Sequence, residues 1–293
     1  MSARAWAALW TVYIIWGSTY LGIKLAGETM PSFFAVSARF LLAGLLLATW
    51  VVWRRGLTAF RATRAEIASA ALIGLLLPGA NALLFVAEHD VPTGLASLII
   101  ASVPLLVVCL RLAGGEHPPR QVVFGVLVGF AGVALLLDPE GGATWWGIAL
   151  TAGSAVAWAV GSYLSARLPL PRDVLAATTY EMLAGGLILL PFGLAQSPDP
   201  SEFSTKSILA FFYLVVFGSL IAFTAYIWLL AHVPLGTVST YAYVNPVVAI
   251  ALGVLFLDEV VTWRIALGAL VVLASVAVVV RRESEAAVEP FAE

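Results

Sequence analysis

Two charged side chains, Arg39 and Glu181, lie inside long stretches of sequence that are otherwise apolar. Each is about seven or eight residues from the nearer end of its stretch, or roughly 10 to 12 Å along a helix. A charge at the centre of a membrane helix costs about 2.5 to 3.5 kcal/mol, so both should face a protein interior or water. Glu181 could act as a protonatable switch or as a counter-charge for an amino group. Alternatively, Arg39 and Glu181 form a fixed ion pair that holds two parts of the protein together.

Two tryptophans, Trp16 and Trp158, also lie in the middle of apolar stretches, and small polar residues follow each of them. They favour a midplane pocket with aromatic walls, in which a ligand or water satisfies the indole N–H. Alternatively, they fill a contact between the first and sixth helices, where Gly17 and Gly161 allow close approach. Ordinary hydrogen bonds between helices would equally explain each polar candidate taken alone. The candidate substrate-binding residues are Trp16, Ser18, Tyr20, Asn81, Trp158, Ser162, Tyr163, Tyr226, Tyr243 and Asn245, with Tyr241 as a further polar tip.

Pro104 and Pro246 are predicted to interrupt the backbone hydrogen bonds of two apolar helices. Each would free a carbonyl group and act either as a gating hinge or as a static kink. Lys24 is expected to extend toward the interface or to meet an anionic group in an outer vestibule. The single cysteine, Cys109, lies within an apolar stretch and is expected to be structural.

The elements that must position these residues are membrane helices. Of 293 residues, 61% are hydrophobic and 11% are charged, which is far more apolar than a water-soluble domain. A spanning helix needs about 20 apolar residues, and continuous apolar runs do not fit the alternating strands of a barrel. The sequence therefore predicts an all-α membrane protein with ten spans. Their expected ranges are 5–24, 32–53, 65–87, 94–112, 119–137, 144–166, 173–195, 207–230, 235–257 and 262–280.

The positions of the basic residues predict the orientation of these spans. If the N-terminus is cytoplasmic, eleven of the 15 lysines and arginines fall in inner loops and tails, as the positive-inside rule requires. Both termini are therefore predicted to be cytoplasmic.

The second half of the chain repeats the first at a shift of 142 residues, at which Trp158 matches Trp16 and Glu181 matches Arg39. Each repeat holds five helices, an odd number, so the second must enter the membrane from the opposite side. Inverted repeats of this kind can open a midplane site alternately to either side. The repeats are predicted at 1–138 and 139–281, with a cytoplasmic tail at 282–293. Val91, Pro92, Gly94, Ser97 and Pro104 recur as Val233, Pro234, Gly236, Ser239 and Pro246.

Several of these motifs resemble the EamA family of the drug/metabolite transporter superfamily, and in particular its YedA-like branch of bacterial inner-membrane exporters. They are residues 13–20 (YIIWGSTY), Arg39 with Phe40, residues 87–92 (AEHDVP) and residues 241–249 (YAYVNPVVA). The resemblance runs from about residue 5 to residue 280. It implies a fold of two five-helix repeats in the plasma membrane of a bacterium and the export of small metabolites. It does not fix the substrate.

The function predicted from these features is secondary active export by alternating access. The expected substrates are amino-acid-like, aromatic or amphipathic drug-like compounds, and the transport could be proton-coupled. No lysine follows a glycine, so the chain has no Walker motif for ATP. No mid-span histidine, acid pair or metal-spaced cluster indicates an enzyme, a metal site or another cofactor.

Other possibilities stay open at this point. A passive facilitator or channel is the main alternative, and an intramembrane lipid-modifying enzyme is a further one. The expected partners are a small-molecule substrate and the lipid bilayer, without nucleic acid, and the sequence leaves monomer and homodimer open.

Overall fold

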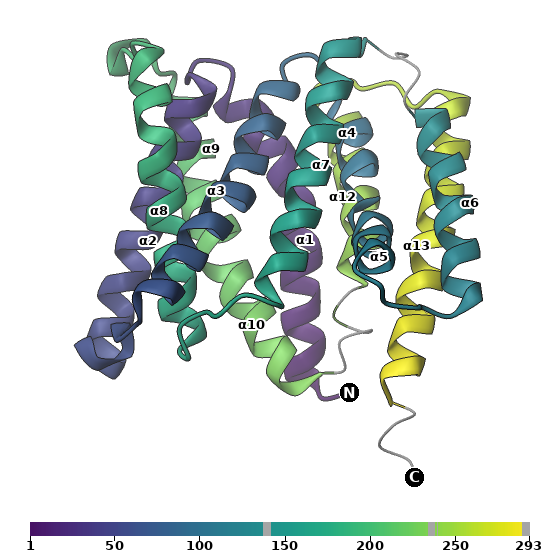
Figure 1. Cartoon of the computed structure of the whole chain (residues 1–293). Helices are drawn as coiled ribbons and strands as arrows, with labels where there is room; N and C mark the ends of the chain where they lie inside the picture. Colours follow the sequence, from purple (N-terminus) through teal and green to yellow (C-terminus); the bar gives the residue numbers. More distant parts are fainter. Residues whose placement is uncertain (137–141, 234–237, 239, 289–293) are drawn as a thin grey trace.

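The protein is a bundle of helices that run side by side (Figure 1). A computed structural model describes residues 1–136, 142–233, 238 and 240–288, and all regular secondary structure among them is helical. The helices are α1 (Ala3–Ala26), α2 (Ser32–Arg55), α3 (Arg64–Ala87), α4 (Thr93–Ile100), α5 (Val103–Ala113), α6 (Arg120–Leu136), α7 (Trp145–Ser165), α8 (Val174–Ala195), α9 (Thr205–Tyr213), the π-helical η3 (Leu214–Ile221), α10 (Ala222–His232), α12 (Tyr241–Leu257) and α13 (Trp263–Val288). Two short 3-10 turns, η1 (Leu57–Phe60) and η2 (Pro200–Glu202), lie in loops.

The ten predicted spans are all represented in the structure. Seven helical segments are long and apolar enough to cross a membrane, and α6 and α12 are shorter apolar helices. The tenth is α1, with 24 residues. The predicted all-α fold with ten transmembrane helices is therefore confirmed. Predicted span residues 137, 235–237 and 239 lie outside the described residues.

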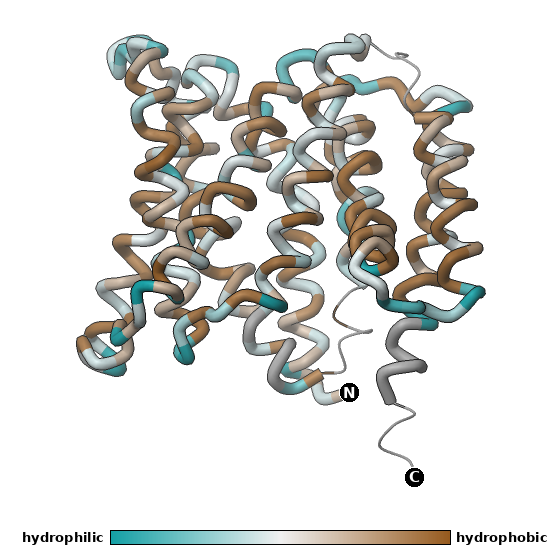
Figure 2. The backbone as a smooth tube through the Cα atoms, in the orientation of Figure 1, coloured by the Kyte–Doolittle hydropathy of each residue, from teal (hydrophilic) through white to brown (hydrophobic). Residues whose placement is uncertain are grey.

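Hydropathy follows this arrangement. Figure 2 shows hydrophilic residues concentrated in the loops at the two ends of the bundle and mainly hydrophobic residues along the helices between them. Large apolar side chains such as Phe124, Phe192 and Leu255 are more than half exposed on the bundle surface. Such a surface matches a lipid environment.

The fourth span consists of two helices. α4 ends at Ile100, a turn occupies Ala101 and Ser102, and α5 begins at Val103. Pro104 lies in the first turn of α5, where its missing N–H costs no helical hydrogen bond. The fourth span is therefore interrupted directly before Pro104, by a turn between two helices rather than by a kink within one helix. Pro246 does lie inside a helix, α12, as predicted.

The eighth span contains a π-helical segment at the position where the third span contains a proline. η3 forms a π-helical stretch between α9 and α10, from Leu214 to Ile221. At the repeat shift of 142 residues, Pro78 inside α3 corresponds to Leu220 inside η3. Regular α-helical hydrogen bonding is therefore interrupted at the equivalent position of both repeats, by a proline in the first and by a π-helical segment in the second.

The two repeats are inverted and interleaved. α1 and α7 begin the repeats and run in opposite directions, and the start of α1 and the end of α13 lie at the same end of the bundle (Figure 1). The most extensive helix contacts join the repeats, as α2 with α8, α6 with α13 and α3 with α7. The main hydrophobic core likewise contains residues of both. Neither repeat is a separate compact unit.

The two ends of the bundle are named here for reference. The termini end holds the start of α1 and the end of α13. The opposite end is called the distal end, and it holds the loops 27–31, 88–92, 196–204 and 258–262.

Ion pairs join the two repeats at the termini end. Arg55 at the end of α2 pairs with Asp173 at 2.5 Å, and Asp173 also accepts the backbone N–H groups at the start of α8. Glu116, after α5, pairs with Arg111 at 2.6 Å and with Arg167 after α7. The hydrogen bond from Arg111 holds the pKa of the Glu116 carboxyl below its usual range.

A very close helix crossing joins α3 to α8 beside Glu181. A Cβ atom added to Gly185 would lie 2.4 Å from the carbonyl oxygen of Gly74 and 2.5 Å from Cγ of Pro78. A Cβ atom on Gly74 would lie 2.3 Å from the carbonyl oxygen of Glu181. Only glycine fits at these two positions, because the obstructing atoms are backbone or a proline ring.

We expect Gly185→Ala to destabilise the protein, because the added methyl group forces α3 and α8 apart. Overpacking of this kind costs about 1 to 3 kcal/mol, which corresponds to a fall of several degrees in thermal midpoint. Thermal unfolding of the purified protein in detergent measures it. Gly79→Ala is the matched control in α3, since no atom lies within 4 Å of its added Cβ. Equal midpoints for the two variants would contradict the close crossing.

Candidate functional site

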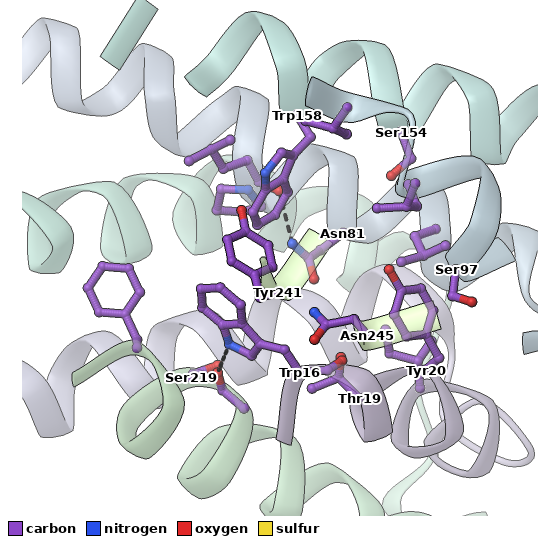
Figure 3. Close-up of a pocket in the computed structure, with 18 of the residues that line it drawn as sticks. Trp16, Thr19, Tyr20, Asn81, Ser97, Ser154, Trp158, Ser219, Tyr241 and Asn245 are labelled. Atoms are coloured by element: carbon purple, nitrogen blue, oxygen red, sulfur yellow. Dashed lines mark hydrogen bonds between the residues drawn. The ribbon is translucent and has the colours of Figure 1, made fainter. Parts of the chain in front are cut away.

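A cavity of about 220 Å³ lies between the two repeats. Helices of both repeats line it, whereas α6 and α13, which pack on each other at one side of the bundle in Figure 1, supply none of the described lining residues. The polar and aromatic residues on its wall are Trp16, Thr19, Tyr20, Arg39, Phe40, Asn81, Ser97, Ser154, Trp158, Thr178, Glu181, Ser219, Phe223, Tyr241 and Asn245. Figure 3 shows ten of them converging on one space.

Arg39 reaches this cavity from α2. Its side chain is buried, and its Nε donates a hydrogen bond to Oγ of Ser219 in η3 at 3.0 Å. One terminal nitrogen, Nη1, is fully buried without a hydrogen-bond partner among the described residues. Gly218 leaves room for the other, since a Cβ atom there would lie 3.2 Å from Nη2. Arg39 is thus oriented by one bond and keeps unused donor capacity at the cavity.

Glu181 lies on the same cavity wall but is not paired with Arg39. Among the described residues, Glu181 makes no ion pair within 4.0 Å and no hydrogen bond through its carboxyl group. The fixed Arg39–Glu181 ion pair considered from the sequence is therefore not formed in this structure. The two opposite charges face a shared space instead, and a ligand or water within it can bridge them.

The two pseudo-equivalent tryptophans are not equivalent in their bonding. The indole N–H of Trp16 donates to the carbonyl oxygen of Gly218 at 3.2 Å (Figure 3). Its ring packs against Tyr226 and Tyr241, with centroids 5.1 Å away in both cases. Trp158 also lines the cavity, but its N–H has no hydrogen bond among the described residues. Trp16 is thus held by a hydrogen bond to the protein, whereas the N–H of Trp158 is not bonded to any described residue.

Helix packing also differs from the alternative in which these tryptophans fill a contact between the first and sixth helices. Gly17 of α1 lies against Val248 and the carbonyl of Asn245 in α12. Gly161 of α7 lies against Leu76 and Leu77 in α3. The two glycines therefore support contacts with different helices rather than with each other.

Amide and hydroxyl groups complete the polar wall. Asn81 donates to the carbonyl of Leu77 at 3.1 Å, which leaves its amide oxygen available (Figure 3). Turned toward α1, the amide nitrogen of Asn245 lies 3.2 Å from the carbonyl oxygen of Tyr13. The hydroxyl groups of Ser97 and Ser154 donate to helix carbonyls at 2.7 Å. These hydroxyl oxygens keep acceptor capacity.

Five residues predicted for the substrate site do not line the cavity. Ser18 bonds to the hydroxyl of Tyr213 at 2.6 Å. Tyr163 lies near the termini end, where the guanidinium of Arg167 stacks on its ring at 3.7 Å. The ring of Tyr226 packs against the ring of Trp16 and does not line the cavity. Ser162 and Tyr243 are partly buried away from the cavity wall.

The other predicted residues are brought together. Trp16, Tyr20, Asn81, Trp158 and Asn245 all line the cavity with Arg39 and Glu181. Pro104 and Pro246 lie on its wall as well, at the turn between α4 and α5 and inside α12. Pro246, inside α12, leaves the carbonyl group four residues before it without its helical partner.

Sequence reasoning missed several hydroxyl residues on the wall, namely Thr19, Ser97, Ser154, Thr178 and Ser219. Ser97 belongs to the repeated motif, so the repeat could have indicated it. Ser219 is positioned by the π-helical winding of η3, which no sequence pattern announced. In the described part of the chain, no three His, Cys, Asp or Glu side chains gather as metal ligands would.

Inverted five-helix repeats around a central polar cavity are the architecture of secondary transporters. The model of the EamA-like transporter family matches residues 5–138 and 145–281. The chain therefore belongs to the EamA-like transporter family and is a membrane transporter, as the sequence motifs predicted.

Two relatives and one solved structure illustrate this similarity. The "uncharacterized inner membrane transporter YedA" of Escherichia coli K12 is 38% identical over 253 residues, covering 84% of this chain and 80% of the relative. An "uncharacterized transporter" of Archaeoglobus fulgidus is 28% identical and covers 94% of this chain and 97% of its own. A crystal structure with 24% identity matches 95% of this chain and 96% of its own with a TM-score of 0.63, which supports the fold.

The different bonding of the two tryptophans yields a stability prediction. Trp16→Phe removes a hydrogen bond to Gly218 worth about 0.5 to 1.5 kcal/mol, whereas Trp158→Phe removes no such bond. We therefore expect Trp16→Phe to lower the thermal midpoint of the purified protein more than Trp158→Phe does. The pseudo-equivalent positions serve as controls for each other. A larger fall for Trp158→Phe would refute the assigned bonding.

Proposed function

We propose that this protein is a secondary carrier of the bacterial inner membrane that exports a small amphipathic metabolite by alternating access. We further propose that the metabolite carries both a carboxylate and an amino group. The observation that supports this proposal is the cavity between the inverted repeats, with Arg39 and Glu181 on its wall and unpaired with each other.

Arg39 suits the carboxylate of the substrate. A guanidinium binds planar anions through several N–H groups, and Nη1 of Arg39 is buried without a hydrogen-bond partner in the described part of the chain. Ser219 fixes the Nε end of the group, so little freedom is lost when an anion binds. Buried donors of this kind favour a substrate that can accept their hydrogen bonds.

Glu181 suits the amino group of the substrate, and also a proton. A carboxylate on a low-dielectric wall needs a cation or a proton to remain there at low cost. An amine supplies that charge when the substrate is bound, and a proton can replace it when the site is empty. Exchange of the two at one carboxylate would couple export to the proton gradient.

The remaining wall suits an apolar or aromatic side chain. Trp16, Trp158 and Tyr241 present ring faces, and in Figure 3 the two indoles lie on opposite sides of Tyr241. The volume of about 220 Å³ is below the roughly 300 to 1,000 Å³ of typical ligand pockets. A small amphipathic metabolite, such as an amino-acid-like compound, fits better than a large drug.

The route of export follows from the proposed orientation. Basic residues are concentrated in the loops of the termini end, which we place in the cytoplasm, with the distal end in the periplasm. Export then requires substrate to enter from the termini end and leave through the distal end. The relatives named as transporters support a carrier over an enzyme.

We expect Arg39→Gln and Glu181→Gln each to weaken substrate binding about 10- to 150-fold, since each removes a hydrogen bond with a charged group worth about 1.5 to 3 kcal/mol. The substrate is first identified as the compound that accumulates outside cells that overproduce the wild type. Saturable counterflow of that compound in proteoliposomes then gives its half-saturation concentration.

Arg61→Gln and Glu202→Gln are the matched controls, because both residues are exposed in loops away from the cavity. They should behave as the wild type. Wild-type binding by both cavity variants would contradict the proposed site, and counterflow that never saturates would indicate a channel.

Proton coupling has a separate signature. Glu181→Gln is expected to abolish efflux driven by a pH gradient, because the amide cannot exchange a proton at the site. Arg39→Gln should weaken binding and still respond to the gradient. The comparison is made with an imposed pH gradient in proteoliposomes at saturating substrate. Unchanged pH dependence in Glu181→Gln would remove this residue from coupling.

A further inference from the structure

A second buried acid, Glu88, lies at the distal end and takes no part in the cavity wall. It follows α3 directly, and only 1% of its surface is exposed. Both of its carboxyl oxygens are buried without a hydrogen-bond partner among the described residues. An ionised carboxylate in such a place would have no hydrogen bond from a described residue as compensation for its lost water.

The nearest cation does not supply that compensation. The ammonium of Lys24, on α1, donates to the backbone carbonyl oxygen of Glu88 and not to its carboxyl group. This bond ties the end of α1 to the end of α3. It leaves the carboxyl group of Glu88 unpaired beside a cation that could pair with it after a small movement.

The second acid of the cluster, Glu259, is fully engaged elsewhere. It accepts hydrogen bonds from the backbone N–H of Thr93 at 2.6 Å, from the Thr93 hydroxyl at 3.0 Å and from the N–H of Gly94 at 3.1 Å. It therefore fastens the loop after α12 to the start of α4. Its negative charge adds to the cost of a second one on Glu88.

Burial raises the pKa of the Glu88 carboxyl well above its usual range, with Lys24 acting against this shift and Glu259 adding to it. Tyr20, one turn before Lys24, also interacts with Glu88 electrostatically. His89 and Asp90 follow in the loop, where Nε2 of His89 lies 3.1 Å from the Ser32 hydroxyl. These are the titratable groups of the cluster.

The cluster lies on the distal side of the cavity. Tyr20 and Leu84 line the cavity, and Lys24 and Glu88 lie four residues further along the same helices. Residues four apart share a helix face, so Lys24 and Glu88 lie roughly one turn beyond the cavity. Opening of the distal end has to separate α1, α3 and α4 at this cluster.

We infer that Glu88 is a proton-binding site that controls the distal end of the cavity. The protonated carboxyl group is compatible with the buried packing seen here, in which the distal end is closed. When the end opens, water reaches the carboxyl group, its O–H proton passes to water, and the resulting carboxylate faces the ammonium of Lys24. Rebinding of a proton favours closure. This inference rests on the alternating-access proposal and adds a proton site distinct from Glu181.

The test measures access to the cavity from the distal side and needs no substrate. Ser97 of α4 lines the cavity, on the inner side of the cluster. Cys109 is the single natural cysteine. In a Cys109→Ser background, Ser97→Cys is labelled with a membrane-impermeant thiol reagent across a pH series. The vesicles are oriented so that Ser201→Cys, exposed in a distal loop, is labelled. The rate for Ser97→Cys is divided by that for Ser201→Cys at each pH.

We expect this relative rate to rise with pH, because ionised Glu88 favours the open end. One linked proton changes the ratio of open to closed protein by up to about tenfold per pH unit. Glu88→Gln, which stays neutral, should give a low rate at every pH. Glu28→Gln is the matched control, an exposed distal acid paired with Lys206, and should keep the rise. Glu88→Asp also keeps a titratable group and should keep the rise if Glu88→Gln does not fold.

A rise that persists in Glu88→Gln, or its absence in the wild type, overturns the inference. If Glu88→Gln does not fold, loss of the pH-dependent rise in Glu88→Asp also overturns the inference. These outcomes are independent of transport. Counterflow with pH-independent labelling leaves the carrier proposal standing without the Glu88 site. If labelling depends on Glu88 but no compound shows counterflow, the Glu88 proton site is supported and the carrier proposal is contradicted.

Discussion

The fold depends on keeping two oppositely charged side chains at membrane depth away from lipid. Arg39 and Glu181 enter from different repeats and from opposite ends of the bundle, and lipid can solvate neither. Because they do not neutralise each other, the helices around them must enclose polar space. The helices that carry the two charges, α2 and α8, belong to different repeats and pack extensively against each other. The same helix packing therefore provides both the charged cavity and the tight bundle.

Interruptions in the helices make that cavity polar. The turn between α4 and α5, Pro78 in α3, Pro246 in α12 and the π-helical winding of η3 all lie along it. Irregular backbone at membrane depth is tolerated where it lines a cavity inside the protein. Gly218 shows the benefit, because its carbonyl accepts the indole N–H of Trp16 and its missing side chain leaves room for Arg39.

The two ends of the bundle are held by different chemistry. At the termini end, ion pairs such as Arg55 with Asp173 lie in partly exposed loops and are individually weak. At the distal end, Lys24 and Glu259 bind backbone groups, and the buried acid Glu88 lies beside them. The distal contacts are thus few, and they surround a buried acid that has no hydrogen bond to its carboxyl group among the described residues. The close crossing of α3 and α8 differs from both ends, because its backbone contacts leave no room for a side chain at Gly74 or Gly185.

Much of this protein could be predicted from its sequence. Apolar runs of membrane length fixed the ten helices, the odd number of helices in each repeat made the repeats inverted, and the motif around Trp16 indicated the family. These properties depend on composition and local periodicity. Tertiary structure alone decided which polar groups meet. Trp16 bonds to Gly218, Arg39 bonds to Ser219, and Tyr163 turns to the termini end. The carboxyl group of Glu88 is buried without a hydrogen-bond partner among the described residues. These contacts join helices far apart in sequence, and their rotation and winding are set by packing, which no local pattern encodes.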